Sequence, residues 1–460
     1  MSHYCSGAGG IRTRMFETND RGIQVSKVTN EAQRSRLFWA SCMALISTSI
    51  AFGVITASMG DFGQVYSLSE TQKGWIGGAA LGGFAISIIA LGVVIEKIGI
   101  AISLKMAFMC HVFGALLMIF AEGFSQLMAG ASIIALGNGC VEAGCNPLVA
   151  TLFPNNKTVK LNQFHVFWPV GIIIGALFGY FLTEAAAALP AGEVWSFMGL
   201  SLLQAKLSIV LVPTVVYGFM FMGQEIPQTE RVQSNIPAAE VTKATQSPLF
   251  LTMLFCMGLT ATLELAPGRW IESLMGPAFV EAGFKNNAAL LVLVYGMALM
   301  AVLRYSAGSF VKKFSPTGLL MGSAILGGVG LFAMTYASSM QSIFLTATIF
   351  YVGVCFFWPT MIGFVAERIP NSGALGLCLM GGIGMLVVGY VTVPGVGMIQ
   401  DYYKEVALLA GEGESAAMAY AGKMAFRWVA ALAIPLVLVF NQLNNRFGKV
   451  SNSENVAVSA

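Results

Sequence analysis

The sequence has few charged residues. Only 10% of its 460 residues are Asp, Glu, Lys or Arg, whereas a soluble domain carries about 25%, and 56% are hydrophobic. This composition excludes a soluble globular protein and predicts an integral membrane protein. The net charge of +3 is too small to indicate a nucleic-acid partner. The first 36 residues also lack the apolar core of a cleaved signal peptide.

Motifs of enzymes and cofactor-binding proteins are missing as well. The eight cysteines show neither CxxC nor paired-loop spacing, and no zinc-binding helix, nucleophile elbow or catalytic triad is present. The runs GGAALGG and MGGIG lie inside apolar segments and follow no strand, so they favour close helix packing over nucleotide binding. We expect a protein that is not an enzyme and has no cofactor or metal.

Long apolar segments dominate what is present. A membrane helix needs about 20 mainly apolar residues, and twelve segments qualify: 39–59, 74–94, 104–121, 125–152, 161–182, 202–222, 249–265, 288–303, 319–336, 343–365, 376–398 and 424–440. We therefore expect an all-α membrane protein with two six-helix bundles, 37–222 and 248–445. A cytoplasmic linker, 223–247, joins the bundles, and tails of residues 1–36 and 446–460 flank them.

The basic residues orient these segments. With the N-terminus in the cytoplasm, 18 of the 25 Lys and Arg residues fall on the inner side, which matches the positive-inside bias. We expect a multi-pass protein of the cytoplasmic membrane, monomeric in the lipid bilayer, with both termini inside.

The two halves of the chain repeat. GVVIEKIG begins at Gly92 after the second span, and GSFVKKFS begins at Gly308 after the eighth, 216 residues later. Pro154 and Pro370 follow spans 4 and 10 at the same separation. Duplicated halves with a site between them near the bilayer midplane are a transporter architecture.

The first of these loops resembles the signature loop of the major facilitator superfamily. The resemblance implies a fold of twelve helices in two pseudo-symmetric bundles over essentially the whole chain, and a gating role for the loop motif. We assign that motif to Gly92, Glu96, Lys97 and Gly99, and to Arg304 and Gly308 in the second half. Arg304 is placed just beyond the eighth span.

A narrower resemblance points to the fucose and glucose proton symporter group. EAGCNP (142–147) with LNQFHVFWPVG (161–171), LELAPGRW (263–270) and FFWPTMIGFV (356–365) are similar to patterns of that group, which implies a sugar substrate. One departure concerns span 1. The studied proton symporters have an aspartate there, whereas AFGVITASMG (51–60) has no acid and the position falls near Thr56.

Glu142 is the central candidate residue. Asn138, Glu142 and Asn146 recur every four residues along span 4, on one stripe of the helix. Glu142 lies about 18 Å from the end of the span at Pro154, near the middle of a core about 30 Å thick. An acid at that depth costs about 2.5 to 3.5 kcal/mol. We expect a substrate-binding or coupling carboxyl, the alternative being an acid that ties helices together.

Span 5 offers further polar groups. Asn162 and His165 share a helix face and Trp168 follows, so all three can line the same cavity as Glu142. In the pattern of the symporter group, His165 takes a glutamine position that faces sugar. A histidine can also take up a proton near neutral pH, so we name Glu142 and His165 as coupling candidates. We interpret His111, in span 3, as a packing residue.

Spans 7 and 10 complete the candidate site. Glu264 precedes Pro267 at an expected bend, where it can accept hydrogen bonds from substrate, pair with Arg269 as an outer gate, or form a plain salt bridge. Trp270 follows the bend. Trp358 is equivalent to Glu142 by the repeat and offers a flat platform for the C–H face of a sugar, or is a core or lipid-facing aromatic.

No Lys or Arg lies near the centre of any of the twelve expected spans. Because a phosphorylated or carboxylated substrate usually needs one, a neutral polyhydroxyl compound fits better. The main hypothesis is a secondary transporter of a hexose or deoxyhexose, working by alternating access with H+, Na+ or no coupling ion. The first alternative is an exporter or antiporter of an amphipathic drug or other metabolite. The second is a membrane sensor that binds without translocating.

Overall fold

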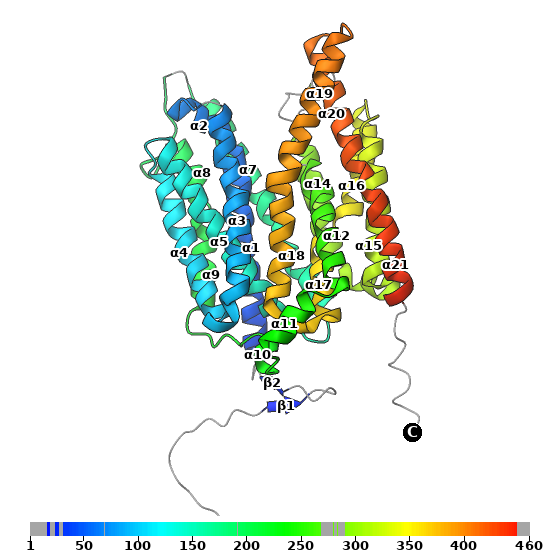
Figure 1. Ribbon diagram of the computed structural model, residues 1–460. Coiled ribbons are helices and arrows are strands. Elements are labelled where there is room, and N and C mark those ends of the chain that lie inside the picture. The colour runs from blue at the N-terminus through cyan, green and yellow to red at the C-terminus, as the bar shows by residue number, and fades with distance from the viewer. Residues whose placement is uncertain are drawn as a thin grey trace, which may run out of the picture.

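Figure 1 shows the protein as a computed structural model with two groups of helices side by side. The structure describes residues 16–18, 24–26, 31–68, 70–190, 192–267, 279, 283 and 290–448. Eleven of the described helices are long and apolar enough to span a membrane, and a shorter apolar helix, Leu291–Tyr305, fills the twelfth place. The expected all-α architecture with two bundles is confirmed.

The described residues of the N-terminal half form nine helices: α1 (Glu31–Ala57), α2 (Met59–Tyr66), α3 (Glu70–Ile98), α4 (Ile100–Ile119), α5 (Phe124–Leu152), α6 (Lys157–Phe164), α7 (Phe167–Ala187), α8 (Leu202–Ser208) and α9 (Leu211–Phe221). Two short antiparallel hairpins accompany them. In one, β1 (Phe16–Thr18) pairs with β2 (Gln24–Ser26), and in the other β3 (Ser196–Phe197) pairs with β4 (Leu200–Ser201).

The linker forms α10 (Glu230–Gln233) and α11 (Ala238–Thr245). The C-terminal half contains α12 (Pro248–Leu265), α14 (Leu290–Tyr305), α15 (Ala307–Met334), α16 (Met340–Val354), α17 (Phe357–Arg368), η3 (Pro370–Ser372), α18 (Gly373–Val387), η4 (Val388–Thr392), α19 (Val393–Leu409), α20 (Glu414–Ala431) and α21 (Ala433–Phe447). The π-helical turn η4 ends at Thr392, two residues before Pro394, whose ring disturbs the α-helical pattern of the preceding turn.

The internal repeat of the sequence is visible in the backbone. Gly99 and Ser315, 216 residues apart, both have a positive φ, 87° and 60°. Each marks the sharp turn between two spans. The eighth span therefore includes the first turns of α15 and reaches this kink, well past its expected end at residue 303.

The two halves pack closely where glycines remove side chains. A Cβ at Gly92 on α3 would collide with Cys378 on α18, and one at Gly382 on α18 would collide with Ile89. Glycine lets the two helix backbones approach in the way that small residues do in membrane helix pairs. The MGGIG run is thus part of a helix interface, as expected.

One helical hairpin extends beyond the other helices. The segment Pro370–Leu409 has 40 residues, and its helical part after the turn η3, from Gly373 to Leu409, is about 55 Å long, well over the thickness of a bilayer core of about 30 Å. Figure 1 shows α19 and α20 rising together at the end opposite the linker. Tyr403 joins them, because its hydroxyl accepts a hydrogen bond from Trp428 Nε1 at 3.2 Å.

The linker connects the two halves at the opposite end. Lys157, which is buried, pairs with Glu230 of α10 at 2.5 Å and donates to the carbonyl of Ala366 at 3.3 Å. Glu96 pairs with Arg231 of α10, and its Oε1 accepts from the amide of Ala374 at 3.3 Å. We call these contacts the linker latch.

Gly373 adjoins the linker latch. Its φ is +58°, and a Cβ there would lie 2.6 Å from Glu96 Oε1 and 3.1 Å from Arg231 Cδ. Both the positive φ and the close approach require glycine at this position. Glu96, one of the expected gating residues, therefore reaches both the linker and the start of α18.

We predict that reversing one charge of the linker latch separates the two halves at the end of the molecule where the linker connects them. In R231E, two carboxylates face each other, and the double variant E96R/R231E restores attraction. The measurement is the rate at which an impermeant maleimide labels T151C, because Thr151 lines a cavity beside Arg231. We expect labelling to rise about tenfold in R231E, or ~1.4 kcal/mol, and to return toward the T151C rate in the double variant. Equal rates in all three proteins would contradict the prediction.

Candidate functional site

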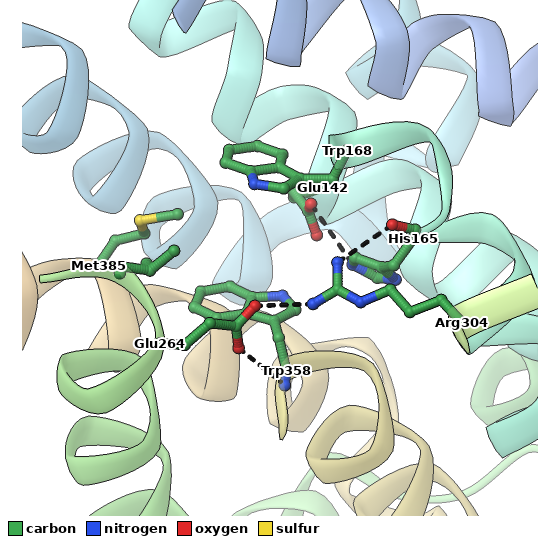
Figure 2. Close-up of a pocket in the computed structure, with 8 residues that line it drawn as sticks. Glu142, His165, Trp168, Glu264, Arg304, Trp358 and Met385 are labelled. Carbon is green, nitrogen blue, oxygen red and sulfur yellow. Dashed lines mark hydrogen bonds and ion pairs between the residues drawn. The ribbon is translucent and has the colours of Figure 1, made fainter. Parts of the chain in front are cut away.

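A cavity lies between the two halves. Its empty volume is about 290 Å³ including its open mouth. The N-terminal half contributes Glu142, His165 and Trp168, and the C-terminal half contributes Glu264, Leu265, Arg304, Trp358 and Met385. Five of these are residues proposed from the sequence, and Figure 2 shows them pointing toward one another.

Glu142 is held within the N-terminal half by its neighbours. It is only 2% exposed, and its Oε2 accepts a hydrogen bond from Asn146 Nδ2, one turn further along α5. Its Oε1 lies 3.6 Å from His165 Nε2. The carboxyl therefore faces the cavity with one oxygen engaged by its own helix and the other directed at the imidazole.

His165 occupies the break between α6 and α7. It caps α6, and its Nδ1 lies 2.9 Å from the carbonyl of Leu161. Its own carbonyl accepts from Arg304 Nη1 at 3.1 Å, across the boundary between the halves. The helix break thus exposes both a ring nitrogen and a backbone oxygen to the cavity.

Arg304 corrects two expectations from the sequence. It is 1% exposed and lines the cavity, so its assignment to the gating loop is wrong, and so is the expectation that no Lys or Arg lies near the centre of a span. Its Nη2 donates to Glu264 Oε1 at 2.7 Å and its Nε to the carbonyl of Cys355 at 2.6 Å.

The physical reason lies in the extent of the span. Charged Arg304 ended the apolar segment at residue 303, which left 16 residues, fewer than the roughly 20 that cross a bilayer. The helix continues through Arg304 to the kink at Ser315. The shortness of that segment was the signal that pointed to Arg304.

Glu264 has partners in the C-terminal half. Besides Arg304, its Oε2 accepts from the amide of Trp358 at 3.4 Å. Of the alternatives left open, the structure thus shows a salt bridge, but with Arg304. Arg269 and Trp270 lie outside the described residues.

Two tryptophans form apolar walls of the cavity. Trp168 packs against Phe52 with ring centroids 5.3 Å apart, and Figure 2 shows its indole and that of Trp358 on different sides of the cavity. A Cβ at Gly384 would lie 2.8 Å from the Trp358 ring, so glycine leaves the space that the ring fills. Trp358 faces the protein interior and not lipid, since it is 6% exposed.

The remaining asparagines have other partners. Asn162 donates to Thr360 Oγ1 at 3.2 Å and so bridges the halves without lining the cavity. Asn138 turns away from Glu142, and its Oδ1 lies 2.9 Å from His111 Nε2. His111 is fully buried and also contacts Tyr217, which agrees with its interpretation as a packing residue.

Comparison with known proteins identifies the family. Residues 37–392 match the model of the Major Facilitator Superfamily. The chain belongs to the major facilitator superfamily. The L-fucose-proton symporter of Escherichia coli strain K12 is 23% identical over 353 residues, which cover 68% of this chain and 78% of that protein. The expected membership of this superfamily is confirmed.

Solved structures of superfamily members share the fold. A crystal structure of the transporter FucP in the outward conformation has a TM-score of 0.66 at 17% identity, covering 87% of this chain and 98% of that one. The proton:xylose symporter XylE bound to 6-bromo-6-deoxy-D-glucose has a TM-score of 0.69 at 13% identity, covering 90% and 96%. Like these superfamily members, the chain is a multi-pass membrane transporter and not an enzyme.

We predict that the Arg304–Glu264 pair is essential for stability as a pair. R304Q and E264Q each leave one buried charge without its partner, so each should lower the free energy of unfolding by about 3 to 5 kcal/mol. The double variant R304Q/E264Q removes both charges and should recover more than half of that loss. Denaturant unfolding in detergent, followed by tryptophan fluorescence, measures these differences.

The matched control is an exposed ion pair. Lys404 and Glu414 lie 3.0 Å apart with 30% and 78% of their side chains exposed, so K404Q should change stability by about 0 to 1 kcal/mol. Additive losses in R304Q/E264Q would contradict the prediction.

Proposed function

We propose that the protein transports a neutral sugar, a hexose or deoxyhexose, by alternating access of its two halves, in symport with a cation. The observation that carries the proposal is the cavity between the halves, where two indole faces stand beside carboxyl groups. Indole faces suit the C–H face of a sugar ring, and carboxylates accept strong hydrogen bonds from hydroxyls. The similarity to an L-fucose-proton symporter supports the same substrate class.

The charges of the cavity favour a neutral substrate. Among the described residues that line it, the one guanidinium is already paired with Glu264. An anionic substrate would have to compete with that carboxylate for Arg304. A sugar needs no such exchange, because its hydroxyls can donate to acceptors that are already in place.

Alternating access is supported by the contacts between the halves. They meet through the glycine-mediated packing of α3 and α18, and through the partly exposed ion pairs of the linker latch. The helix packing can separate without leaving a polar group unpaired, and water can replace the partners of Glu96 and Arg231. The buried hydrogen bonds of Asn162 to Thr360 and of Arg304 to His165 need new partners when the halves part. We place the linker and both termini in the cytoplasm, as the basic residues indicate.

One observation favours a second candidate. Leu265 and Met385 line the cavity together with the tryptophans, and an apolar, aromatic wall beside Glu142 also suits an amphipathic cation. In that case the protein exports such a compound by antiport. Uptake and competition assays with both substrate classes separate the two functions.

We predict selective uptake of neutral sugars by the protein reconstituted in liposomes. The panel contains hexoses, deoxyhexoses, a hexose phosphate and a lipophilic cation, each with imposed proton or sodium gradients. At least one neutral sugar should be taken up and the phosphate excluded. Transport of the cation alone would overturn the sugar assignment in favour of the second candidate.

Trp358 provides a sharper test. W358A removes one wall of the cavity and should raise KM for the transported sugar about tenfold, or ~1.4 kcal/mol. The matched control is W75A, because Trp75 on α3 is 62% exposed and lies outside the cavity. Equal KM values in the two variants would exclude the stacking role of Trp358.

A further inference from the structure

Two cations meet outside the cavity, at the linker end of the N-terminal half. Arg34 lies in the first turn of α1, and Lys160 lies on α6, the short helix that follows α5. Both reach the ring of Phe153, the residue that caps the end of α5. The guanidinium carbon of Arg34 lies 5.6 Å from the ring centroid, and Lys160 Nζ lies 4.9 Å from it. Three helices therefore bring two positive charges to one aromatic ring.

A second ring completes this group. Phe38, one turn after Arg34 on α1, packs edge-on against Phe153 with the ring centroids 5.5 Å apart, and Lys160 Nζ lies 5.5 Å from the Phe38 centroid. We call Arg34, Phe38, Phe153 and Lys160 the basic patch. A ring face attracts a cation through its quadrupole, but it carries no net charge. The two rings therefore position both cations without neutralising them.

The acidic side chains of the described residues do not neutralise the basic patch either. Glu31 lies 3.7 Å from Arg34, but 89% of the Glu31 side chain and 44% of the Arg34 side chain are exposed, so water weakens this ion pair. Lys160 donates to the uncharged amide oxygen of Gln163 at 2.9 Å, and no carboxylate of the described residues pairs with it. The basic patch thus keeps an excess of positive charge, which an anion can balance.

Trp39 indicates the depth of the basic patch in the membrane. It follows Phe38 directly and is the first residue of the expected first span. It is 48% exposed, and its ring packs edge-on against Phe167 of α7 with centroids 5.7 Å apart. Tryptophan prefers the level of the lipid headgroups, so the neighbouring cations lie at that level too. With the linker in the cytoplasm, as proposed above, this is the inner leaflet, whose anionic lipids make its surface negative.

We propose that Arg34 and Lys160 bind the phosphate of an anionic phospholipid of the inner leaflet, with Trp39 and Phe167 beside its glycerol and upper acyl chains. The guanidinium of Arg34 can donate two parallel hydrogen bonds to a phosphate, and the ammonium of Lys160 adds a point charge. The exposed indole next to the charges favours a lipid over a soluble anion, because it offers apolar surface to the acyl chains. This site is separate from the transport cavity and goes beyond the proposed transport function.

Photocrosslinking of lipids to the full-length protein tests the site directly. The protein is placed in nanodiscs of phosphatidylcholine that contain a limiting amount of phosphatidylglycerol with a photoactivatable group near the top of one acyl chain. Crosslinked peptides are then mapped by mass spectrometry. We expect the lipid on peptides that contain Trp39 or Phe167. Phosphatidylcholine with the same photoactivatable chain is the lipid control, and equal crosslinking of the two lipids at these peptides would overturn the proposal.

Charge variants measure the contribution of each cation. R34Q and K160Q should each lower crosslinking of phosphatidylglycerol at Trp39 about fivefold, since one basic residue near an anionic membrane surface contributes ~1 kcal/mol. The matched control is K313Q, because Lys313 is an exposed cation 5.3 Å from the centroid of a single ring, that of Phe314, in the other half. It should leave crosslinking at Trp39 unchanged. An equal loss in K313Q would show general attraction to the surface and overturn the proposal.

Conservative variants separate charge from packing. R34K and K160R keep both positive charges and should retain most of the crosslinking. If each loses as much as R34Q or K160Q, the side chains act through packing and the proposal fails. These variants, with the comparison of the two lipids in the unaltered protein, decide the question even if R34Q or K160Q does not fold.

A competition experiment distinguishes a lipid from a soluble anion. Inorganic phosphate in excess should leave the crosslink at Trp39 in place, because it makes no contact with the apolar side of the site. Displacement of the lipid by phosphate would overturn the lipid assignment in favour of a soluble anion. None of these measurements requires a substrate or transport, so the lipid site and the proposed sugar transport fail separately.

Discussion

The buried pairing of Arg304 with Glu264 is the interaction on which the rest of the site depends. Both side chains are almost fully buried within a membrane span, where an unpaired charge costs several kcal/mol. The pair also holds other groups, because Glu264 accepts from the amide of Trp358 and Arg304 donates to the carbonyl of His165. A single ion pair therefore positions an aromatic wall of one half and the helix break of the other.

The contacts between the halves differ in what separation would cost. The packing of α3 against α18 is apolar and contains glycine, so its separation exposes backbone that is already hydrogen-bonded within each helix. At the linker latch, Arg231 and Glu96 are 16% and 12% exposed, so water can reach them when they part. Other hydrogen bonds between the halves are buried: Asn162 donates to Thr360 Oγ1, Lys157 to the carbonyl of Ala366, and Arg304 to the carbonyl of His165. Separation of the last pair requires a new donor for the His165 carbonyl, such as water or a substrate hydroxyl.

Much of the site could be predicted from the sequence because helical periodicity and the repeat place residues reliably. The spacing of four residues indicated that Glu142 and Asn146 lie together, and the internal repeat indicated that Trp358, in the other half, lines the same cavity as Glu142. The same spacing failed for Asn138. Residues four apart differ by about 40° around a helix, so Asn138 and Asn146 diverge by about twice that angle, and Asn138 faces His111 instead. Arg304 was misplaced because a charge ends an apolar segment in hydropathy even where a partner on another helix allows the span to continue.

The position of Arg304 changes the reason for excluding anionic substrates, though not the exclusion itself. The absence of a central cation was the premise drawn from the sequence, and the structure contains one. An anion that bound Arg304 would displace Glu264 Oε1, which now lies 2.7 Å from the guanidinium. Glu264 would then be a second uncompensated carboxylate beside Glu142, in the same cavity as the anion. The gain from one new ion pair is offset by the loss of the old one and by repulsion from two carboxylates, which supports the proposal that the substrate is not an anion.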